Sequence, residues 1–182
     1  KILNEVKIIG GGKRKHLCPN CSSSDRLRMI FSYLKSKTNI FETKERISIL
    51  HVAPERQLLE IFSNQKNIDY YPCDKFNYGG QIIEADINNL SFDDYKFDYI
   101  FCNHVLEHIV TDLKAMSELY RVLKVNGKAI LQIPYSVSIN KTIEDLSVTD
   151  PKLKEEKFGQ DDHVRIYSKK DYINKLEKVN FK

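Results

Sequence analysis

The stretch from Glu84 to Ile109, EADINNLSFDDYKFDYIFCNHVLEHI, indicates how this chain folds. Two short apolar segments, IIEAD and FDYIFCN, end in polar residues: Asp86 closes the first, and Asn103 and His104 follow the second. Short runs of β-branched and aromatic residues are typical of buried parallel strands. Ligands collect where such strands end, at their carboxyl edge. The stretch therefore predicts two parallel strands with a binding site at one edge of their sheet.

The flanking sequence extends this pattern in both directions. Downstream, the helical TDLKAMSELYRVLK leads through an Asn-Gly turn to a strand at 128–134, and upstream, strands are predicted at 47–53 and 68–74. Apolar residues at helical spacing predict a helix over 25–41, and another is expected over 169–181. Strands alternating with helices predict an α/β fold, a doubly wound and mostly parallel sheet.

Length and composition fit one soluble globular domain. The chain has 182 residues, of which 30% are charged and 41% hydrophobic, so disorder is not expected to be its main state. No apolar run approaches the roughly 18 residues of a membrane span, and no signal-peptide pattern opens the sequence. We therefore expect a cytoplasmic protein without a membrane partner.

The first 24 residues form a basic arm, which we predict to be separate from a domain over 25–182. Residues 1–15 carry five basic side chains against one acidic side chain, whereas the whole chain has a net charge of +4. Such an arm could contact phosphate or acidic sugar, or it could simply be solvated. A pI near 8.7 is too mild to indicate a nucleic-acid partner.

The arm also contains the motif C-P-N-C, formed by Cys18 and Cys21. Two thiolates at this spacing can face one zinc ion, but a tetrahedral site needs two more ligands. His16 is close but unsuitably spaced, so reduced cysteines in a loop are the alternative. The other two cysteines, Cys73 and Cys102, lie in predicted strands, where small core residues are expected.

Beyond these local patterns, D-I-N-N-L-S-F-x-x-x-x-F-D-Y-I-F-C-N-H-V-L-E-H-I and E-L-Y-R-V-L-K-V-N-G-K-A-I-L-Q-I-P together resemble a known family. The resemblance covers roughly 47–135 and is to class I S-adenosylmethionine-dependent methyltransferases of the type 11 group. It implies a Rossmann-like fold, S-adenosylmethionine as the cofactor and methyl transfer as the activity. C-P-N-C with Arg26 and Arg28 resembles a subset with a C-P-x-C-x-S-x-x-R-x-R motif. Members of the family continue into a final antiparallel strand pair, which we do not find in this sequence.

The resemblance also implies a set of cofactor-binding residues. Where the family has a glycine-rich loop this chain has H-V-A-P-E, which lacks glycine, although a small residue and a helix N-terminus still offer amides to a carboxylate. Glu55 would accept the cofactor's ammonium group, and Asp74, about twenty residues further on, would accept from both ribose hydroxyls. Asp86 and the next amide would bind the adenine ring. The predicted cofactor-binding residues are His51, Ala53, Pro54, Glu55, Asp74, Asp86, Ile87 and Asn103.

Two histidines are candidates for catalysis. His104 follows the fourth strand, whose end faces the methyl group in this family, whereas Glu107 and His108 fit a family pattern that is mostly structural. Residues 135–167 form an insertion too long for a plain connection, which predicts a lid or binding loop. There His163 could be a base and Arg165 an anion clamp, or both could belong to a salt-bridged surface segment.

The sequence therefore predicts methyl transfer from S-adenosylmethionine to a small-molecule or sugar-type acceptor. One alternative is a ribosomal RNA base methyltransferase whose C-P-N-C arm belongs to a zinc module. Another is a methyltransferase-like binding module without activity, because H-V-A-P-E departs from the glycine-rich loop. The acceptor and the oligomeric state are not specified by the sequence.

Overall fold

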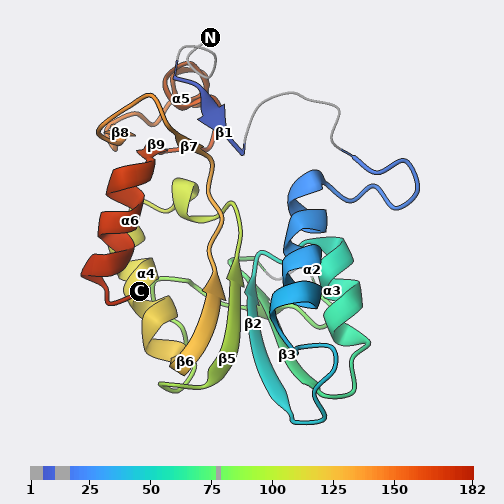
Figure 1. The fold of residues 1–182 in the computed structure, drawn as a ribbon. Coiled ribbons are helices and arrows are strands. Elements are labelled where there is room, and N and C mark those ends of the chain that lie inside the picture. Colours follow the sequence, from blue (N-terminus) through green and yellow to red (C-terminus); the bar gives the residue numbers. More distant parts are fainter. Residues whose placement is uncertain (1–5, 11–16, 77–78) are drawn as a thin grey trace.

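The computed structural model describes residues 6–10, 17–76 and 79–182 and shows a central sheet between two layers of helices (Figure 1). In chain order the elements are β1 (Ile8–Ile9), α2 (Asp25–Lys37), β2 (Ile47–Val52), α3 (Arg56–Ser63), β3 (Ile68–Asp74), β4 (Ile83–Glu84), β5 (Phe97–Cys102), the 3₁₀ turn η1 (Leu106–His108), α4 (Asp112–Val122), β6 (Leu123–Ile130), β7 (Tyr135–Ser136), β8 (Ile143–Glu144), α5 (Pro151–Phe158), β9 (Arg165–Ser168) and α6 (Lys169–Lys178). None of the described helices is long and apolar enough to cross a membrane.

The main sheet has five parallel strands in the order β4-β3-β2-β5-β6. From β2 the chain proceeds outward through β3 to β4, then returns to the other side of β2 and proceeds through β5 to β6. The strand order therefore reverses between β2 and β5, which is where doubly wound sheets bind their ligands. This architecture confirms the predicted Rossmann-like α/β fold.

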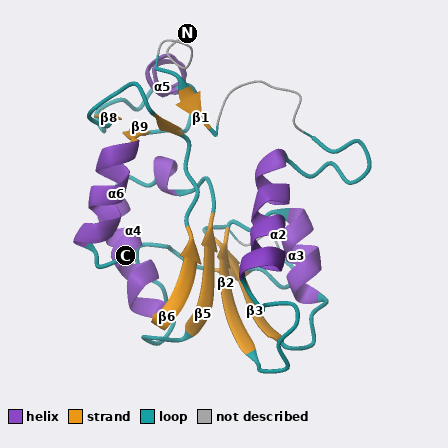
Figure 2. Ribbon diagram, viewed as in Figure 1, coloured by secondary structure: helices purple, strands orange, loops and turns teal. Residues whose placement is uncertain are grey.

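Helices cover both faces of the sheet, as Figure 2 shows, and each face has its own apolar core. Leu27, Ile30 and Leu34 of α2 pack with α3 against one face, and Ala115, Met116 and Leu119 of α4 pack against the other. The central strands are buried on both faces, which explains their nearly continuous apolar sequence. Helix α2 begins at Asp25 as predicted, because the Ser24 hydroxyl caps it by accepting a hydrogen bond from the Leu27 amide (3.2 Å).

Two strand boundaries differ from the prediction. β4 is only two residues long, and β6 spans Leu123–Ile130 instead of 128–134. Leu123 already pairs with Phe97, and the register then shifts so that Lys128 pairs with Tyr99. The Asn-Gly pair therefore lies within an irregular part of the strand, with Asn126 in the left-handed region (φ 65°), and does not precede it.

A second, smaller sheet lies over the carboxyl ends of the main strands (Figure 1). Its strand order is β1-β7-β9-β8, and Ile8 of the N-terminal segment pairs with Ser136 of the predicted insertion. Val6, Phe158 and Ile166 form its apolar core. Residues predicted as a separate arm and residues predicted as a lid thus build one layer, which we call the small sheet.

Candidate functional site

The tips of β2 and β5 are joined by a polar network at the point where the strand order reverses. Nε2 of His51 lies 2.8 Å from one oxygen of Glu55, and the Asn103 amide donates to the other oxygen (3.2 Å). Nδ1 of His51 lies 2.8 Å from the Tyr70 hydroxyl. His51 is fully buried among aromatic rings, so it would act on a bound ligand only through Glu55.

The network fixes the protonation pattern of its members. Burial raises the pKa of Glu55, but the hydrogen bonds and charge of His51 and the hydrogen bond from Asn103 outweigh it and hold that pKa below its ordinary value. Burial, together with the charge of Glu55, raises the pKa of Tyr70, so its hydroxyl keeps its proton. A carboxylate only accepts, so Nε2 of His51 carries a proton and donates to Glu55. The result is a negative charge at the reversal point.

Ala53 follows β2 and turns the chain toward α3. Its backbone lies in the left-handed region (φ 48°), a conformation that disfavours residues with a Cβ, and its amide donates to the Cys73 carbonyl (2.8 Å). The turn therefore has glycine-like backbone geometry without a glycine. Pro54 follows directly and Glu55 is the N-cap residue of α3.

Asp74 ends β3 and Asp86 lies two residues beyond the neighbouring strand β4, and each also closes a local turn. One oxygen of Asp74 accepts from the Phe76 amide (3.3 Å), and one oxygen of Asp86 accepts from the Asn88 amide (2.9 Å). These turns use one oxygen of each carboxylate and hold the side chains at the edge of the sheet. Ile87 is buried beside them. Ribose and adenine binding by these residues remain predictions.

A buried acceptor at the reversal point fits the predicted cofactor. Within the described residues, Oδ1 of Asn103 is buried and has no hydrogen-bond partner, although its Nδ2 bonds Glu55. Buried acceptors without a donor are uncommon in folded proteins. An ammonium group supplies such a donor, and the ionised Glu55 would balance its charge. Glu55 and Asn103 therefore fit the amino-acid part of S-adenosylmethionine.

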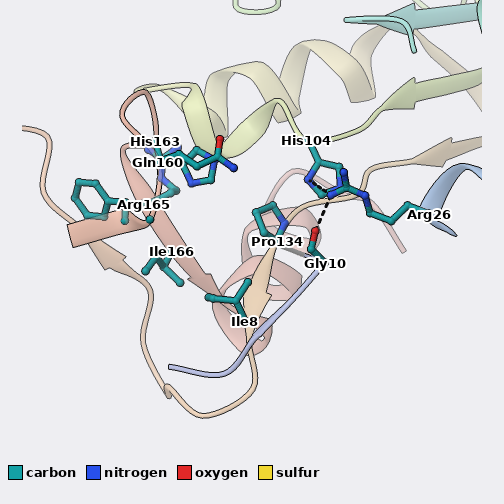
Figure 3. A pocket seen from close by; sticks show the side chains of 11 residues that line it. Ile8, Gly10, Arg26, His104, Pro134, Gln160, His163, Arg165 and Ile166 are labelled. Carbon is teal, nitrogen blue, oxygen red and sulfur yellow. Dashed lines mark hydrogen bonds between the residues drawn. The ribbon is translucent and has the colours of Figure 1, made fainter. Parts of the chain in front are cut away.

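Two cavities adjoin His104 beneath the small sheet. They have volumes of about 50 and 390 Å³, and both are lined by Gly10, Arg26 and His104. Figure 3 shows Arg26 and His104 facing one another beside Gly10, with His163 at the opposite end of the smaller cavity. The walls of the larger cavity are mainly apolar and include Ile9, Met29, Leu131, Ile133, Tyr172 and Ile173.

His104 links a carboxylate to a guanidinium. Its Nδ1 lies 3.3 Å from Oε1 of Glu107, and Nη1 of Arg26 lies 2.7 Å from its Nε2. Nη1 of Arg26 also lies 3.1 Å from Nδ1. A guanidinium only donates, so one of the two ring nitrogens accepts from Arg26. The His104 backbone is in the left-handed region (φ 55°), where its amide donates to the Gln132 carbonyl (2.7 Å). Such strained positions cluster at functional sites.

The two residues predicted in the insertion are both buried but differ in their surroundings. The His163 ring packs edge-on against His108, with ring centroids 4.6 Å apart. Burial, aided by His108, lowers the pKa of His163, so the ring is neutral at pH 7.

Arg165 closes a backbone turn from inside the protein. Nη1 donates to the carbonyls of Leu106 (2.8 Å) and Ile109, Nη2 donates to the Val110 carbonyl (3.0 Å), and Nε pairs with Glu144. The side chain is fully buried. The acid that Arg165 bonds is Glu144 on β8, and not Asp161 or Asp162, which lie close to it in sequence. With most of its donors committed to the protein, Arg165 is better suited to holding the fold than to clamping an anion.

The four cysteines differ in how deeply their thiols are buried. Cys73 and Cys102 are fully buried, and burial raises the pKa of Cys73 to about 12, so both thiols are protonated core residues. Cys21 is exposed, and hydrogen bonds from Ser23 and Cys18 lower the pKa of its thiol. His16 lies outside the described residues. Zinc binding by Cys18 and Cys21 remains a prediction.

Sequence reasoning missed three contributors to the site. Tyr70 was read only as a strand residue, Arg26 only as part of a motif, and Glu107 only as structural. Tyr70 is 19 residues from its partner His51, whereas Arg26 and Glu107 are 78 and 3 residues from their shared partner His104. Only the spacing of Glu107 from His104 gave a local signal, because three residues separate neighbours on a helical turn.

Comparison with known proteins relates part of this chain to methyltransferases. Residues 45–131 match a family model described as a methyltransferase domain. An uncharacterized protein of Methanocaldococcus jannaschii is 34% identical over 54% of this chain and 44% of its own length. The 2-phytyl-1,4-beta-naphthoquinone methyltransferase of Arabidopsis thaliana is 32% identical over 57% of this chain and 35% of its own length. This chain thus spans less than half the length of these two relatives.

Solved structures show the same fold at low sequence identity. A SAM-dependent methyltransferase of Archaeoglobus fulgidus has a TM-score of 0.56 and 16% identity, covering 86% of this chain and 66% of its own. The phosphoethanolamine N-methyltransferase 2 of Haemonchus contortus, in complex with S-adenosyl-L-methionine, has a TM-score of 0.56 and 17% identity, covering 85% of this chain and 36% of its own. The fold is therefore that of the class I methyltransferases. The sequence match to a methyltransferase domain lies within it, over the main sheet.

Proposed function

We propose that this domain binds S-adenosylmethionine and transfers its methyl group to a small-molecule acceptor. The observation that carries the proposal is the position of the larger cavity, which adjoins His104 directly beyond the reversal point of the strand order. The bound cofactor supplies an electrophilic methyl group on a sulfonium. The protein's own contribution is to align the acceptor and to manage its proton.

On the cofactor side, charge and hydrogen bonding indicate four residues that would bind S-adenosylmethionine. Glu55 keeps a negative charge and Asn103 has an unpaired buried acceptor, so together they would hold an ammonium group. Asp74 and Asp86 stand at the ends of β3 and just beyond β4, and would hold the ribose and the adenine. The left-handed turn at Ala53 would bring the backbone close to the cofactor.

On the acceptor side, His104 is the base that we propose. Glu107, 3.3 Å from Nδ1, would fix the tautomer by accepting from that nitrogen, and the lone pair of Nε2 would then be directed at Arg26, whose Nη1 lies nearer to Nε2 (2.7 Å) than to Nδ1 (3.1 Å). An acceptor hydroxyl that replaces this contact would give its proton to Nε2. The guanidinium of Arg26 would then stabilise the negative oxygen that forms. His163, buried against His108, would reach an acceptor only through the smaller cavity.

The walls of the larger cavity support an apolar acceptor over a sugar-type acceptor. Seven of its twelve lining residues are apolar or aromatic, so a sugar would leave several of its hydroxyls without partners there. A quinone methyltransferase among the relatives also supports a small apolar acceptor. A ribosomal RNA base, the other class considered, gains no support from this cavity.

Calorimetry with S-adenosylhomocysteine tests cofactor binding. We expect measurable binding by the unaltered chain and at least about tenfold weaker binding by Asp74→Asn, since a hydrogen bond to a charged group contributes about 1.5–3 kcal/mol. Asp69→Asn is the matched control, because Asp69 lies at the opposite end of β3 and pairs with Arg46. A folded chain that does not bind the ligand would be a scaffold, and the proposal would be wrong.

A methyl-transfer assay with phenol and quinol probes tests the base. His104→Ala should reduce turnover by roughly 10²-fold or more, the usual contribution of a positioned base, with little change in S-adenosylhomocysteine affinity. Unchanged turnover in a folded His104→Ala protein would exclude His104 and leave His163 as the remaining candidate.

A further inference from the structure

Glu107, His108 and His163 bring three metal-ligand side chains together beside the acceptor cavities. One ligand atom from each lies within 4.8 Å of the others. Glu107 and His108 belong to η1, whereas His163 lies two residues before β9 of the small sheet. Segments more than fifty residues apart in the chain thus meet at this cluster.

The carboxylate of Glu107 is the strongest sign of a missing partner. The residue is 1% exposed, and its Oε2 has no hydrogen-bond partner among the described residues. Its Oε1 faces His104 at 3.3 Å, so this oxygen is already engaged. A buried carboxylate oxygen without a donor is costly unless a cation or a metal ion approaches it.

Both histidines are held by partners of the kind that orient metal ligands. Nδ1 of His108 lies 3.1 Å from a carboxylate oxygen of Asp162, which leaves Nε2 to face an ion. The His163 ring hydrogen bonds with the backbone of Phe158. Metal-bound histidines almost always donate their second ring N–H to a carboxylate or a carbonyl. In addition, the Val164 amide donates to the Glu107 carbonyl (3.1 Å) and fixes the two segments to each other.

We propose that Glu107, His108 and His163 bind a divalent transition-metal ion of the zinc type. Two imidazoles and one carboxylate suit such ions and leave a fourth position open. Tetrahedral ligands at about 2.0–2.1 Å from zinc are roughly 3.3 Å apart, so small side-chain rotations close the site. The ion would tether the small sheet to η1 at the wall of the smaller cavity. This inference does not depend on methyl transfer.

Two sites compete for an ion in this chain, and the experiment separates them. Zn²⁺ is titrated into chelator-treated protein by calorimetry, with elemental analysis after dialysis. We expect one ion to remain bound when Cys18 and Cys21 are both replaced by serine, and that ion to be lost in His163→Ala. Asp162→Asn should weaken binding by 10- to 100-fold, the usual effect of removing a partner that orients a ligand.

Two further measurements guard against misfolded variants. His108→Gln changes a residue whose side chain is 27% exposed, so the fold should tolerate it, as far-ultraviolet circular dichroism can verify. Zn²⁺ should raise the Tm of the unaltered chain but not that of His108→Gln. The visible spectrum of bound Co²⁺ should lack thiolate charge-transfer bands.

The proposal fails if His163→Ala and His108→Gln retain the ion at unchanged affinity. It also fails if the double cysteine variant loses the ion, or if the unaltered protein binds no ion. In that last case the cluster is an ion-pair network in which His108 pairs with Asp162 and Glu107 pairs with His104.

Discussion

The two halves of the binding edge are built in different ways. The proposed cofactor side, at the tips of β2, β3 and β5, takes its candidate side chains from the ends of parallel strands of six or seven residues. The acceptor side lies under the small sheet, whose strands are two to four residues long and pair across distances such as Ile8 to Ser136. The first half is therefore specified locally, and the second depends on contacts between distant segments.

This difference identifies what holds each half in place. On the cofactor side, strands buried on both faces position the polar residues, and the His51 network is added to an existing frame. Among the residues that the structure describes, the small sheet has a core of three buried apolar side chains. Its attachment relies on polar contacts, above all those of Arg165 with η1 and β8. Substitutions in the two halves should consequently have unequal effects.

The largest effect is expected from Arg165→Ala. Removing the fully buried guanidinium takes away the donor that Arg165 supplies to the carbonyls of Ile109 and Val110 and to Glu144, and one of the donors to Leu106. Breaking a buried charge pair costs about 3–5 kcal/mol, and because Glu144 is partly exposed we expect a loss near the lower end of that range. Urea unfolding should show a decrease of this size in the free energy of unfolding. Arg56→Ala is the control, because Arg56 forms an exposed pair with Glu60 that is worth at most about 0.5 kcal/mol. An equal loss in both variants would remove the distinction between the halves.

The sequence predicted the cofactor half far better than the acceptor half. The bounds of β3 match the prediction, and those of β2 and β5 match to within one residue, because a buried parallel strand is a continuous apolar run. β6 was misplaced because an Asn-Gly pair normally precedes a strand, whereas here it interrupts one.

The acceptor half gave no comparable local signal. Two-residue strands such as β1 and β7 are too short to show a period, and their pairing is decided by distant contacts. The contact between Arg26 and His104 joins residues 78 positions apart. For Arg165 the sequence left an anion clamp and a salt-bridged surface residue as alternatives, because a pattern reveals the kind of side chain, not whether backbone carbonyls already surround it.

An intermediate effect is expected from pH on the cofactor half. The pKa of Glu55 is lower in the folded chain than its ordinary value of about 4.3, so the unfolded chain binds more protons in this range. The stability that Glu55 contributes is therefore fully present above its ordinary pKa. It is lost as the pH falls through the lowered value.

Urea unfolding of the unaltered chain and of Glu55→Gln, followed from pH 6 downward, measures this contribution. The free energy difference between the two proteins should shrink as the pH falls, while contributions from all other carboxyl groups cancel. A difference that stays constant with pH would mean that Glu55 carries no special charge, and the proposed ammonium site would lose its basis.

The smallest effect is expected at Ala53, where the cofactor half departs from a glycine-rich loop. Alanine at φ 48° pays roughly 1–2 kcal/mol for the left-handed conformation, whereas glycine adopts it freely but loses more backbone entropy on folding. Ala53→Gly should therefore stabilise the chain by roughly 0.5–1 kcal/mol in urea unfolding, the difference between these two terms. Ala129→Gly on β6, where φ is negative, should instead destabilise it by a similar amount.

If S-adenosylhomocysteine binds Ala53→Gly at least as tightly as the unaltered chain, the turn needs only its backbone shape, and H-V-A-P-E replaces the glycine-rich loop in function. If affinity falls, the methyl group of Ala53 contacts the ligand, and the loop is a distinct solution to cofactor binding.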